Sequence, residues 1–319
     1  MFELKRILDF GNRKVQEGKR VLLATIYKTK GSSYRKKWTQ MIVADDFTYT
    51  GHLSGGCVEQ AVLTESEKVF RTKENLTFVY DGQYKLGCKG SIFILLELVD
   101  SEAFKNLKEQ VELCDEGRIA FIQGMEFGGA DEVRTYFQFR AFKIPMSATK
   151  NFTEKEETRT VRPQNKVVIV GSEFDGEILA NLAMQVGFIS NLVVNQNYAI
   201  PSDKPYKIFH AEPKTLPSKV NFDSRTALIL MTHSFAKDLA FLKEIIYTDL
   251  KYFGILGPPR RKEELLENLF ENFSENNLEL IDKIENIKSP IGLNIGSKIP
   301  EEIAISILAE LIQVFNKTN

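Results

Sequence analysis

Short apolar runs alternate with polar turns along this chain, and the character of the alternation changes near its middle. In the first half, amphipathic stretches with a period near 3.6 residues are mixed with short runs rich in β-branched and aromatic residues. This mixture of helices and strands predicts an α+β domain. The predicted helices cover residues 3–17, 61–70 and 102–115, and the predicted strands cover 21–27, 41–44, 48–50, 76–80, 91–98, 118–123 and 133–142.

The apolar density falls between Ala148 and Lys166, where polar and charged residues dominate. A segment of this kind has little surface to bury and is typical of a linker. We therefore predict a first domain over 1–147, a linker over 148–166 and a second domain over 167–319. The length of 319 residues also favours two domains, each with its own core.

Beyond residue 166, continuous apolar runs alternate with helical patterns. Such runs are typical of strands buried on both faces, and their alternation with helices predicts a doubly wound parallel sheet. The second domain is therefore predicted to be Rossmann-like. Its predicted strands cover 167–170, 191–194, 207–209, 227–231 and 252–255, and its predicted helices cover 175–186 and 236–246 and begin again at Glu263 and Pro300.

Composition narrows the classes of function. The chain carries 42 Lys and Arg against 43 Asp and Glu, a formal net charge of −1, so we expect no nucleic-acid binding. No window is apolar and long enough to span a bilayer, so we expect no membrane contact. Cys57, Cys88 and Cys114 are odd in number and lack CxxC spacing, which argues against disulfides and structural zinc. We predict a soluble protein of the reducing cytoplasm.

The stretch Gly51–Glu59 carries the first candidate chemistry. Its glycines form a turn that places Cys57 and Glu59 at the predicted start of a helix. The N–H groups and positive dipole end of a helix hold anions and favour the thiolate of a cysteine placed there. We therefore predict an activated Cys57 thiol beside an anion site. The alternative is an ordinary turn that buries a small cysteine.

Residues Gly171–Gly176 follow the first strand of the second domain, where a dinucleotide-binding domain has its phosphate loop. The loop keeps the first and third glycines of the GxGxxG pattern, but Glu173 replaces the middle one. Its carboxylate adds bulk and negative charge where a pyrophosphate would approach the backbone. Asn195 also stands where an acidic residue would hold the ribose. We expect a Rossmann-like fold without productive NAD or NADP binding.

A basic cluster follows the last predicted strand, where Gly257 precedes Arg260–Lys262. Ligands of open α/β sheets gather at the carboxyl ends of strands, so these cations are placed to bind a phosphate. His233, at the end of another strand, faces the same region. We predict an anion pocket between the two domains, formed by the Cys57 turn and this cluster. The alternative is a solvated helix start.

Both halves of the chain contain motifs that resemble one known family, in the same order. The matching motifs are Gly31–Ser33, Ser54–Glu59, Leu86–Gly90, Thr232–His233, Tyr252–Gly257 with Arg260–Lys262, and Pro290–Leu293 followed by Pro300–Ala304. The chain is similar to the xanthine dehydrogenase accessory factor family, also called the XdhC and CoxI family. It departs from the family's usual motifs at Tyr34–Trp38, Lys89 and Glu173.

The resemblance implies an XdhC/CoxI-type first domain and a maturation factor that binds molybdenum cofactor, a molybdopterin. Such a factor assists the sulfuration of the cofactor and its insertion into a xanthine dehydrogenase-type molybdenum hydroxylase. The implied partners are that apo-enzyme, a cysteine desulfurase as sulfur donor, and a second copy of the chain in a homodimer. The implied role is a cofactor-binding chaperone rather than a turnover enzyme.

The predicted site follows from the same motifs. Cys57 and Glu59 are the predicted catalytic residues, with Cys57 as a molybdenum contact. The predicted cofactor-binding residues are Ser54, Gly55, Gly56, Cys57, Cys88, His233, Gly257, Arg260, Arg261 and Lys262. Two alternatives remain open: a nucleotide-dependent oxidoreductase that uses the Rossmann-like domain, and a non-catalytic partner protein that has lost the cofactor site.

Overall fold

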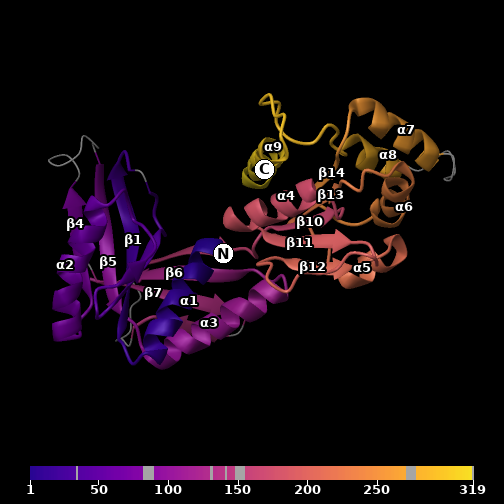
Figure 1. Ribbon diagram of the computed structural model, residues 1–319. Coiled ribbons are helices and arrows are strands. Elements are labelled where there is room, and N and C mark those ends of the chain that lie inside the picture. Colours follow the sequence, from indigo (N-terminus) through magenta and orange to yellow (C-terminus); the bar gives the residue numbers. More distant parts are fainter. Residues whose placement is uncertain are drawn as a thin grey trace. The chain divides into compact units, whose positions relative to one another are not determined.

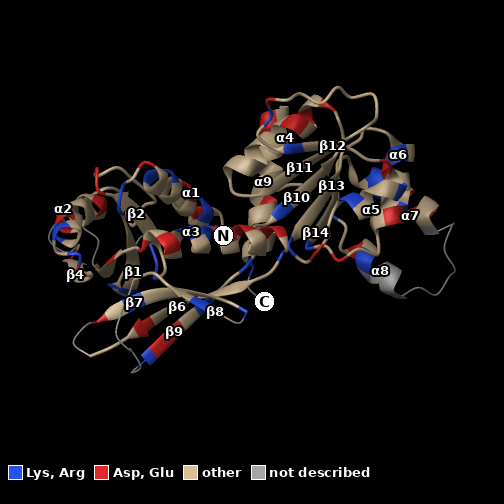
Figure 2. Cartoon of the chain, turned by 90° about the horizontal axis from the view of Figure 1, so that it is seen from below, with Lys and Arg blue, Asp and Glu red and all other residues tan. Residues whose placement is uncertain are grey.

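The computed structural model describes residues 1–33, 35–81, 90–129, 132–140, 142–147, 155–270 and 278–317. The chain divides into two compact units, Met1–Pro163 and Gln164–Asn319 (Figure 1). Acidic and basic residues are interspersed along the ribbon of both units, in keeping with the net charge of −1 (Figure 2). Among the described residues, no helix combines the length and the apolar character that crossing a membrane requires.

An antiparallel sheet with the strand order β3-β2-β1-β5-β4 forms one part of the first unit. Its strands are β1 (Val21–Gly31), β2 (Gln40–Ala44), β3 (Tyr49–Thr50), β4 (Leu76–Asp81) and β5 (Gly90–Leu98). Helix α2 (Cys57–Thr72) covers one face, where Leu22 and Ile26 share a core with Val62. Because β3 ends at Thr50 and α2 begins at Cys57, packed elements hold both ends of the glycine turn.

A second antiparallel sheet, with the order β8-β7-β6-β9, completes the first unit. Its strands are β6 (Phe121–Phe127), β7 (Val133–Phe139), β8 (Phe142–Pro145) and β9 (Lys155–Val161). Helices α1 (Phe2–Gln16) and α3 (Ser101–Glu116) share one core with both sheets, in which Ile7 and Phe104 pack among strand residues such as Phe137. The α+β architecture predicted for the first half is confirmed.

The structure differs from the linker predicted over 148–166. Residues 155–161 form β9, which pairs antiparallel with β6, from Val161 opposite Phe121 to Lys155 opposite Phe127. The polar sequence conceals this strand because most of its side chains are exposed or half-buried, and Val161 supplies its contact with the core. Residues 148–154 lie outside the described residues. The boundary between the compact units falls after Pro163.

The second unit is built on a parallel sheet with the order β12-β11-β10-β13-β14. Its strands are β10 (Lys166–Val170), β11 (Ile189–Val194), β12 (Lys207–His210), β13 (Thr226–Leu230) and β14 (Tyr252–Ile255). The first of them, β10, is central, with Val170 level with Val193 on one side and Leu230 on the other. This order puts the switch point of a doubly wound sheet between β10 and β13. The predicted Rossmann-like domain is confirmed.

Helices cover both faces of this parallel sheet, which explains why its strands are apolar on both sides. Val167 and Ile169 pack on the side of α4 (Phe174–Gln185) and α9 (Pro300–Asn316), two helices that lie side by side (Figure 1). Val168 and Val170 face the opposite core. The helices of that core are α5 (Leu216–Lys219), α6 (Phe235–Ile245), α7 (Pro259–Phe270) and α8 (Leu278–Glu285), with a 3₁₀ turn over Pro213–Thr215.

Candidate functional site

The glycine turn before α2 is held from inside by Glu59. The buried Glu59 carboxylate accepts hydrogen bonds at Oε1 from the backbone N–H groups of Leu53 (2.8 Å) and Ser54 (2.7 Å). At Oε2 it accepts from the Gly56 N–H (2.8 Å) and the Ser54 hydroxyl (3.1 Å). Burial by itself would raise the pKa of Glu59, but these hydrogen bonds outweigh it and hold the pKa below its ordinary value. Glu59 therefore stays ionised and fixes the turn.

Cys57 is the first residue of α2, and it is exposed. Gly56, with φ 126°, has the backbone conformation that glycine adopts without strain and turns the chain into the helix. Tyr80 in β4 is a neighbour that sequence reasoning missed: burial, and then the nearby Cys57 and Glu59, raise the pKa of Tyr80. No local pattern could reveal Tyr80, because only the packing of β4 beside α2 brings it to the thiol.

The loop after β10 passes very close to the end of β13. Gly171 has φ 153°, and a Cβ atom there would lie 2.4 Å from the carbonyl oxygen of Met231, so only glycine fits. The loop continues through Ser172 and the exposed Glu173, which precedes α4. Asn195, after β11, donates from Nδ2 to the Ser172 hydroxyl at 3.1 Å. Glu173 and Asn195, the two residues that depart from a dinucleotide-binding pattern, therefore border the same space.

That space is a cavity of about 610 Å³ at the carboxyl ends of β10 to β13. Ala240 and Phe241 belong to its apolar wall, and Asn195 and Thr232 contribute polar groups. Its position is the one at which open α/β sheets bind ligands, and its volume is in the range of small-molecule sites. The glycine pattern of the loop at Gly171 had already pointed to the carboxyl ends of these strands.

Three charged residues line the cavity: Glu173, Glu212 and Lys237. Sequence reasoning found Glu173 through the glycine pattern but missed Glu212 and Lys237. These two are isolated charges in a loop after β12 and in the first turns of α6, and no motif marks them. Only the strand order of the folded sheet brings them to one cavity.

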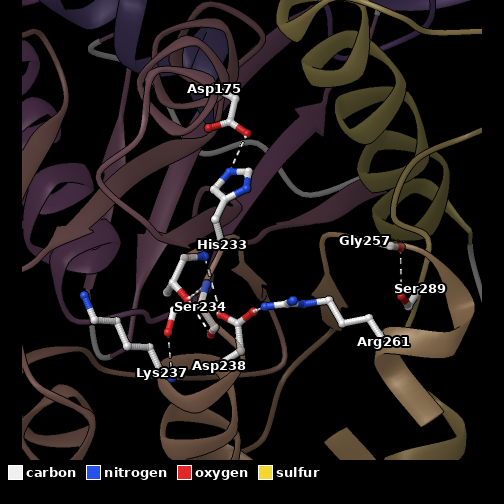
Figure 3. Close-up of polar contacts among 9 residues, drawn as sticks. Asp175, His233, Ser234, Lys237, Asp238, Gly257, Arg261 and Ser289 are labelled. Atoms are coloured by element: carbon white, nitrogen blue, oxygen red, sulfur yellow. Dashed lines mark hydrogen bonds and ion pairs between the residues drawn. The ribbon is translucent and has the colours of Figure 1, made fainter. Parts of the chain in front are cut away.

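His233 and Asp175 connect the loop after β13 to the first turn of α4 (Figure 3). His233 Nε2 lies 3.0 Å from Asp175 Oδ2, and Asp175 belongs to the first turn of α4. His233 itself has φ 55°, a left-handed conformation in which histidine is more common than most residues. The imidazole that the sequence predicted to bind an anion is therefore already in contact with a carboxylate.

Arg261, from the predicted basic cluster, is bound to a buried carboxylate (Figure 3). Its Nη2 donates to Asp238 Oδ2 at 2.9 Å, and the Thr232 hydroxyl donates to Asp238 Oδ1 at 2.6 Å. Gly257, with φ 129°, makes room for this side chain, because a Cβ atom there would lie 2.7 Å from Arg261 Cδ. The arrangement gives Arg261 and Gly257 a structural role.

Lys262 and Arg260, the other two cations of the cluster, have partners other than Asp238. Lys262 donates to the carbonyl oxygen of Ile287 at 2.6 Å. The side chain of Arg260 is 85% exposed and pairs with Glu264 at 2.9 Å within α7. None of these cations lines the 610 Å³ cavity, where Lys237 is the basic residue among the described ones. Arg260 is the member of the cluster that is most open to a ligand.

The structure brings some predicted site residues together and leaves others apart. Ser54, Gly55, Gly56, Cys57 and Glu59 share one turn in the first unit, whereas His233, Gly257 and Arg260–Lys262 belong to the second. A pocket formed by both groups stays a prediction. Cys88 and Lys89 lie outside the described residues. Within the described ranges, no group of three or more His, Cys, Asp or Glu side chains is placed to hold a metal ion.

Comparison with known proteins places both units in one family. Residues 15–81 match the XdhC and CoxI family, and residues 167–311 match the XdhC Rossmann domain. The chain belongs to the XdhC and CoxI family. The family named from the sequence motifs is thereby confirmed, and the two matches contain the Cys57 turn and the residues of the 610 Å³ cavity, respectively.

Relatives within the XdhC and CoxI family match over most of their length. A protein named as a probable xanthine dehydrogenase subunit from Bacillus subtilis (strain 168) is 24% identical, with 94% of each chain covered. The molybdenum cofactor insertion chaperone PaoD from Escherichia coli (strain K12) is 24% identical over 97% of this chain and 88% of its own. A crystal structure described as a xanthine dehydrogenase from Bacillus halodurans is 27% identical, with a TM-score of 0.80, and covers 97% of this chain and 95% of the other.

Proposed function

We propose that this protein binds molybdenum cofactor and assists its sulfuration and its insertion into a xanthine dehydrogenase-type molybdenum hydroxylase. The observation that carries the proposal is the exposed Cys57 thiol at the start of α2, on a turn that the Glu59 carboxylate holds in place. Membership of the XdhC and CoxI family supports it, and one relative is named a molybdenum cofactor insertion chaperone.

The residues of the Cys57 turn suit the metal-bearing part of the cofactor. The cofactor, when bound, supplies a molybdenum centre on a pterin dithiolene. A cysteine sulfur is a soft ligand that suits such a centre or its sulfur atoms, and the first N–H groups of α2 would hold a negatively charged group. Because both oxygens of Glu59 are occupied by Leu53, Ser54 and Gly56, we assign Glu59 to positioning of the turn.

The 610 Å³ cavity of the second unit suits the organic part of the cofactor. Ala240 and Phe241 offer an apolar wall to a flat ring, while Asn195 and Thr232 offer hydrogen bonds at its edge. Lys237 in the cavity and the exposed Arg260 are the cations that would meet a phosphate.

The test is the cofactor content of the protein purified from a bacterium that makes molybdenum cofactor. We expect the parent protein to carry molybdenum and pterin in equal amounts, measured by mass spectrometry of the metal and by fluorescence of the oxidised pterin. Cys57→Ala should lose most of both, whereas Cys114→Ala should keep them. A parent protein with neither molybdenum nor pterin would contradict the proposal, and equal loading of the two variants would remove Cys57 from it.

The proposal extends to the source of the sulfur, the recipient of the cofactor and the oligomeric state of the factor. We propose that a cysteine desulfurase supplies the sulfur, that the apo-hydroxylase receives the cofactor, and that the factor acts as a homodimer. Reconstitution of an apo-hydroxylase with loaded factor, with and without a cysteine desulfurase, should give active enzyme only when both proteins are present. Sedimentation of the purified factor measures its oligomeric state.

The 610 Å³ cavity also favours a second candidate, a nucleotide-dependent oxidoreductase. Glu173 and Asn195 argue against it because they remove the close approach to a pyrophosphate and the acidic partner of a ribose. We expect calorimetry to detect no saturable binding of NAD or NADP at millimolar concentration. Micromolar binding would favour the oxidoreductase instead. A protein that binds the apo-hydroxylase but carries no pterin would favour the non-catalytic partner.

A further inference from the structure

A separate cavity of about 280 Å³ lies in the first unit. The first turns of α1, the connection between β1 and β2, and strand β9 line it. Its apolar wall includes Phe2, Ile7 and Val161, and its polar side includes Gln40 and Arg159. The cavity therefore combines hydrocarbon surface with one guanidinium group.

Among the described residues that line this cavity, Arg159 is a charged side chain without an acidic partner. Its Nε donates to Oε1 of the fully buried Gln123 at 2.8 Å, which fixes one edge of the guanidinium. Within the described part of the chain, no carboxylate forms an ion pair with Arg159, and its terminal amino groups donate to no acceptor. Burial lowers the pKa of Arg159 to about 10, while the more distant Glu3 charge opposes this effect. A cation in such surroundings is stabilised by an anion.

Trp38 holds the guanidinium in place. The central carbon of the Arg159 guanidinium lies 5.5 Å from the centre of the Trp38 ring, a cation–π distance. Trp38 has φ 76°, and its N–H donates to the carbonyl oxygen of Ile26 at 2.8 Å, which anchors it to β1. With Gln123 on one edge and Trp38 at its face, the guanidinium is positioned before any ligand arrives.

Two charged side chains at or near the cavity are already paired. Glu3 lines the cavity, but its carboxylate accepts from Arg35 at 3.0 Å. Lys37, next to Trp38, pairs with Glu157. Among the described side chains that line the cavity, Arg159 is therefore the cation without a carboxylate partner, and the first turn of α1 adds the positive end of its dipole. This balance matches a single negative charge better than a phosphate dianion.

We propose that this cavity binds a small organic monocarboxylate, with its carboxylate on Arg159 and its hydrocarbon part against Ile7 and Val161. The free edge of a guanidinium donates two parallel hydrogen bonds to the two oxygens of a carboxylate. The apolar wall then shields a short alkyl chain from water. The site does not depend on the molybdenum cofactor, and it includes Trp38 from the segment that departs from the family's motifs.

Intrinsic fluorescence tests the proposal directly, because Trp38 is the single tryptophan of the chain. The full-length protein is titrated with butanoate, with its neutral counterpart butanamide, and with inorganic phosphate. We expect a saturable change in Trp38 emission with butanoate, and at least about tenfold weaker responses with the other two, since a charge-assisted hydrogen bond is lost or the apolar part is missing.

Variants separate Arg159 from general effects of charge. Arg159→Gln should weaken butanoate binding by at least about tenfold, and Arg159→Lys, which keeps the charge but loses the paired donors, should weaken it less. Arg162→Gln, at an exposed position three residues further on, should bind as the parent does. Circular dichroism checks that each variant is folded.

Four results would overturn the proposal. They are no saturable response of the parent protein to butanoate, equal responses to butanoate and butanamide, tighter binding of phosphate than of butanoate, and unchanged butanoate binding by folded Arg159→Gln. If that variant fails to fold, the three probes on the parent protein still decide the question.

Discussion

The buried carboxylate of Asp238 accepts a hydrogen bond from Arg261 at 2.9 Å, which joins the first turn of α6 to the first turn of α7. Asp238 is 1% exposed, and a buried charge of this kind needs its partner. Arg261 is therefore committed to the fold, although its place in a basic cluster suggested a ligand.

Replacement of Arg261 by Ala should lower the free energy of unfolding by about 3 kcal/mol, because it leaves the Asp238 charge buried without its partner. Replacement of Arg260, whose exposed pair with Glu264 spans one turn of α7, should cost less than about 0.5 kcal/mol. Urea denaturation of the two variants makes the comparison. Equal losses would contradict the structural role of Arg261.

Glu59→Gln should destabilise the first unit by about 2 kcal/mol, since the amide nitrogen of Gln would face a backbone N–H that now has an acceptor. Glu67→Gln is the matched control, because Glu67 is exposed in the same helix. Denaturation curves at pH 7 test the difference. A Glu59 variant as stable as the Glu67 variant would show that the turn does not need this carboxylate.

Glu97 in β5 should make the stability of the first unit depend on pH. Its fully buried carboxyl accepts from Thr135 N–H at 2.8 Å and from the Thr135 hydroxyl at 2.5 Å. Burial raises the pKa of Glu97 from 4.5 to about 7, against the opposing effect of these hydrogen bonds. Between these two values the folded protein keeps a proton that the unfolded chain releases. The contribution of protonated Glu97 to the free energy of unfolding is thus fully present below pH 4.5 and is lost as the pH rises to 7. The loss amounts to about 3 kcal/mol in all.

The measurement compares the parent protein with Glu97→Gln, which has no proton to lose. Unfolding free energies are taken at intervals from pH 4.5 to 8. The stability of the variant relative to the parent should increase with pH across this window. A constant difference between the two would rule out the raised pKa.

Cys57 should react with iodoacetamide at pH 7 at least about tenfold faster than Cys114. Cys57 is exposed at the start of α2, whereas Cys114 is half-buried in α3, where burial raises its pKa against the opposing charge of Arg140. Mass spectrometry of the peptides follows each cysteine separately. Similar rates would remove the case for a reactive Cys57.

The sequence pattern was most informative where burial is uniform. The apolar run 167–170 predicted β10 to within one residue, because helices cover both faces of that strand. The pattern failed for β9, an edge strand whose mostly exposed and half-buried polar residues look like a linker. Pairing with β6 makes it a strand, and such pairing depends on residues distant in sequence.

The candidate site was predictable where one short motif contains it. The glycine turn correctly placed Cys57 at the start of a helix, and the altered loop at Glu173 pointed to the edge of the sheet that holds the larger cavity. The Asp238 partner of Arg261 and the neighbour Tyr80 were out of reach, because tertiary packing alone brings each of them to its contact.

Helices pack on both faces of the parallel sheet, and this packing limits which substitutions members of this family can accept. The buried apolar strand residues of the second unit each belong to one of two cores, so a substitution there disturbs packing before it alters ligand binding. Residues 172–173, 195–197 and 212–213, in the loops that follow the strands, belong to neither core. New ligand preferences can therefore evolve in these loops while the scaffold beneath them keeps its stability.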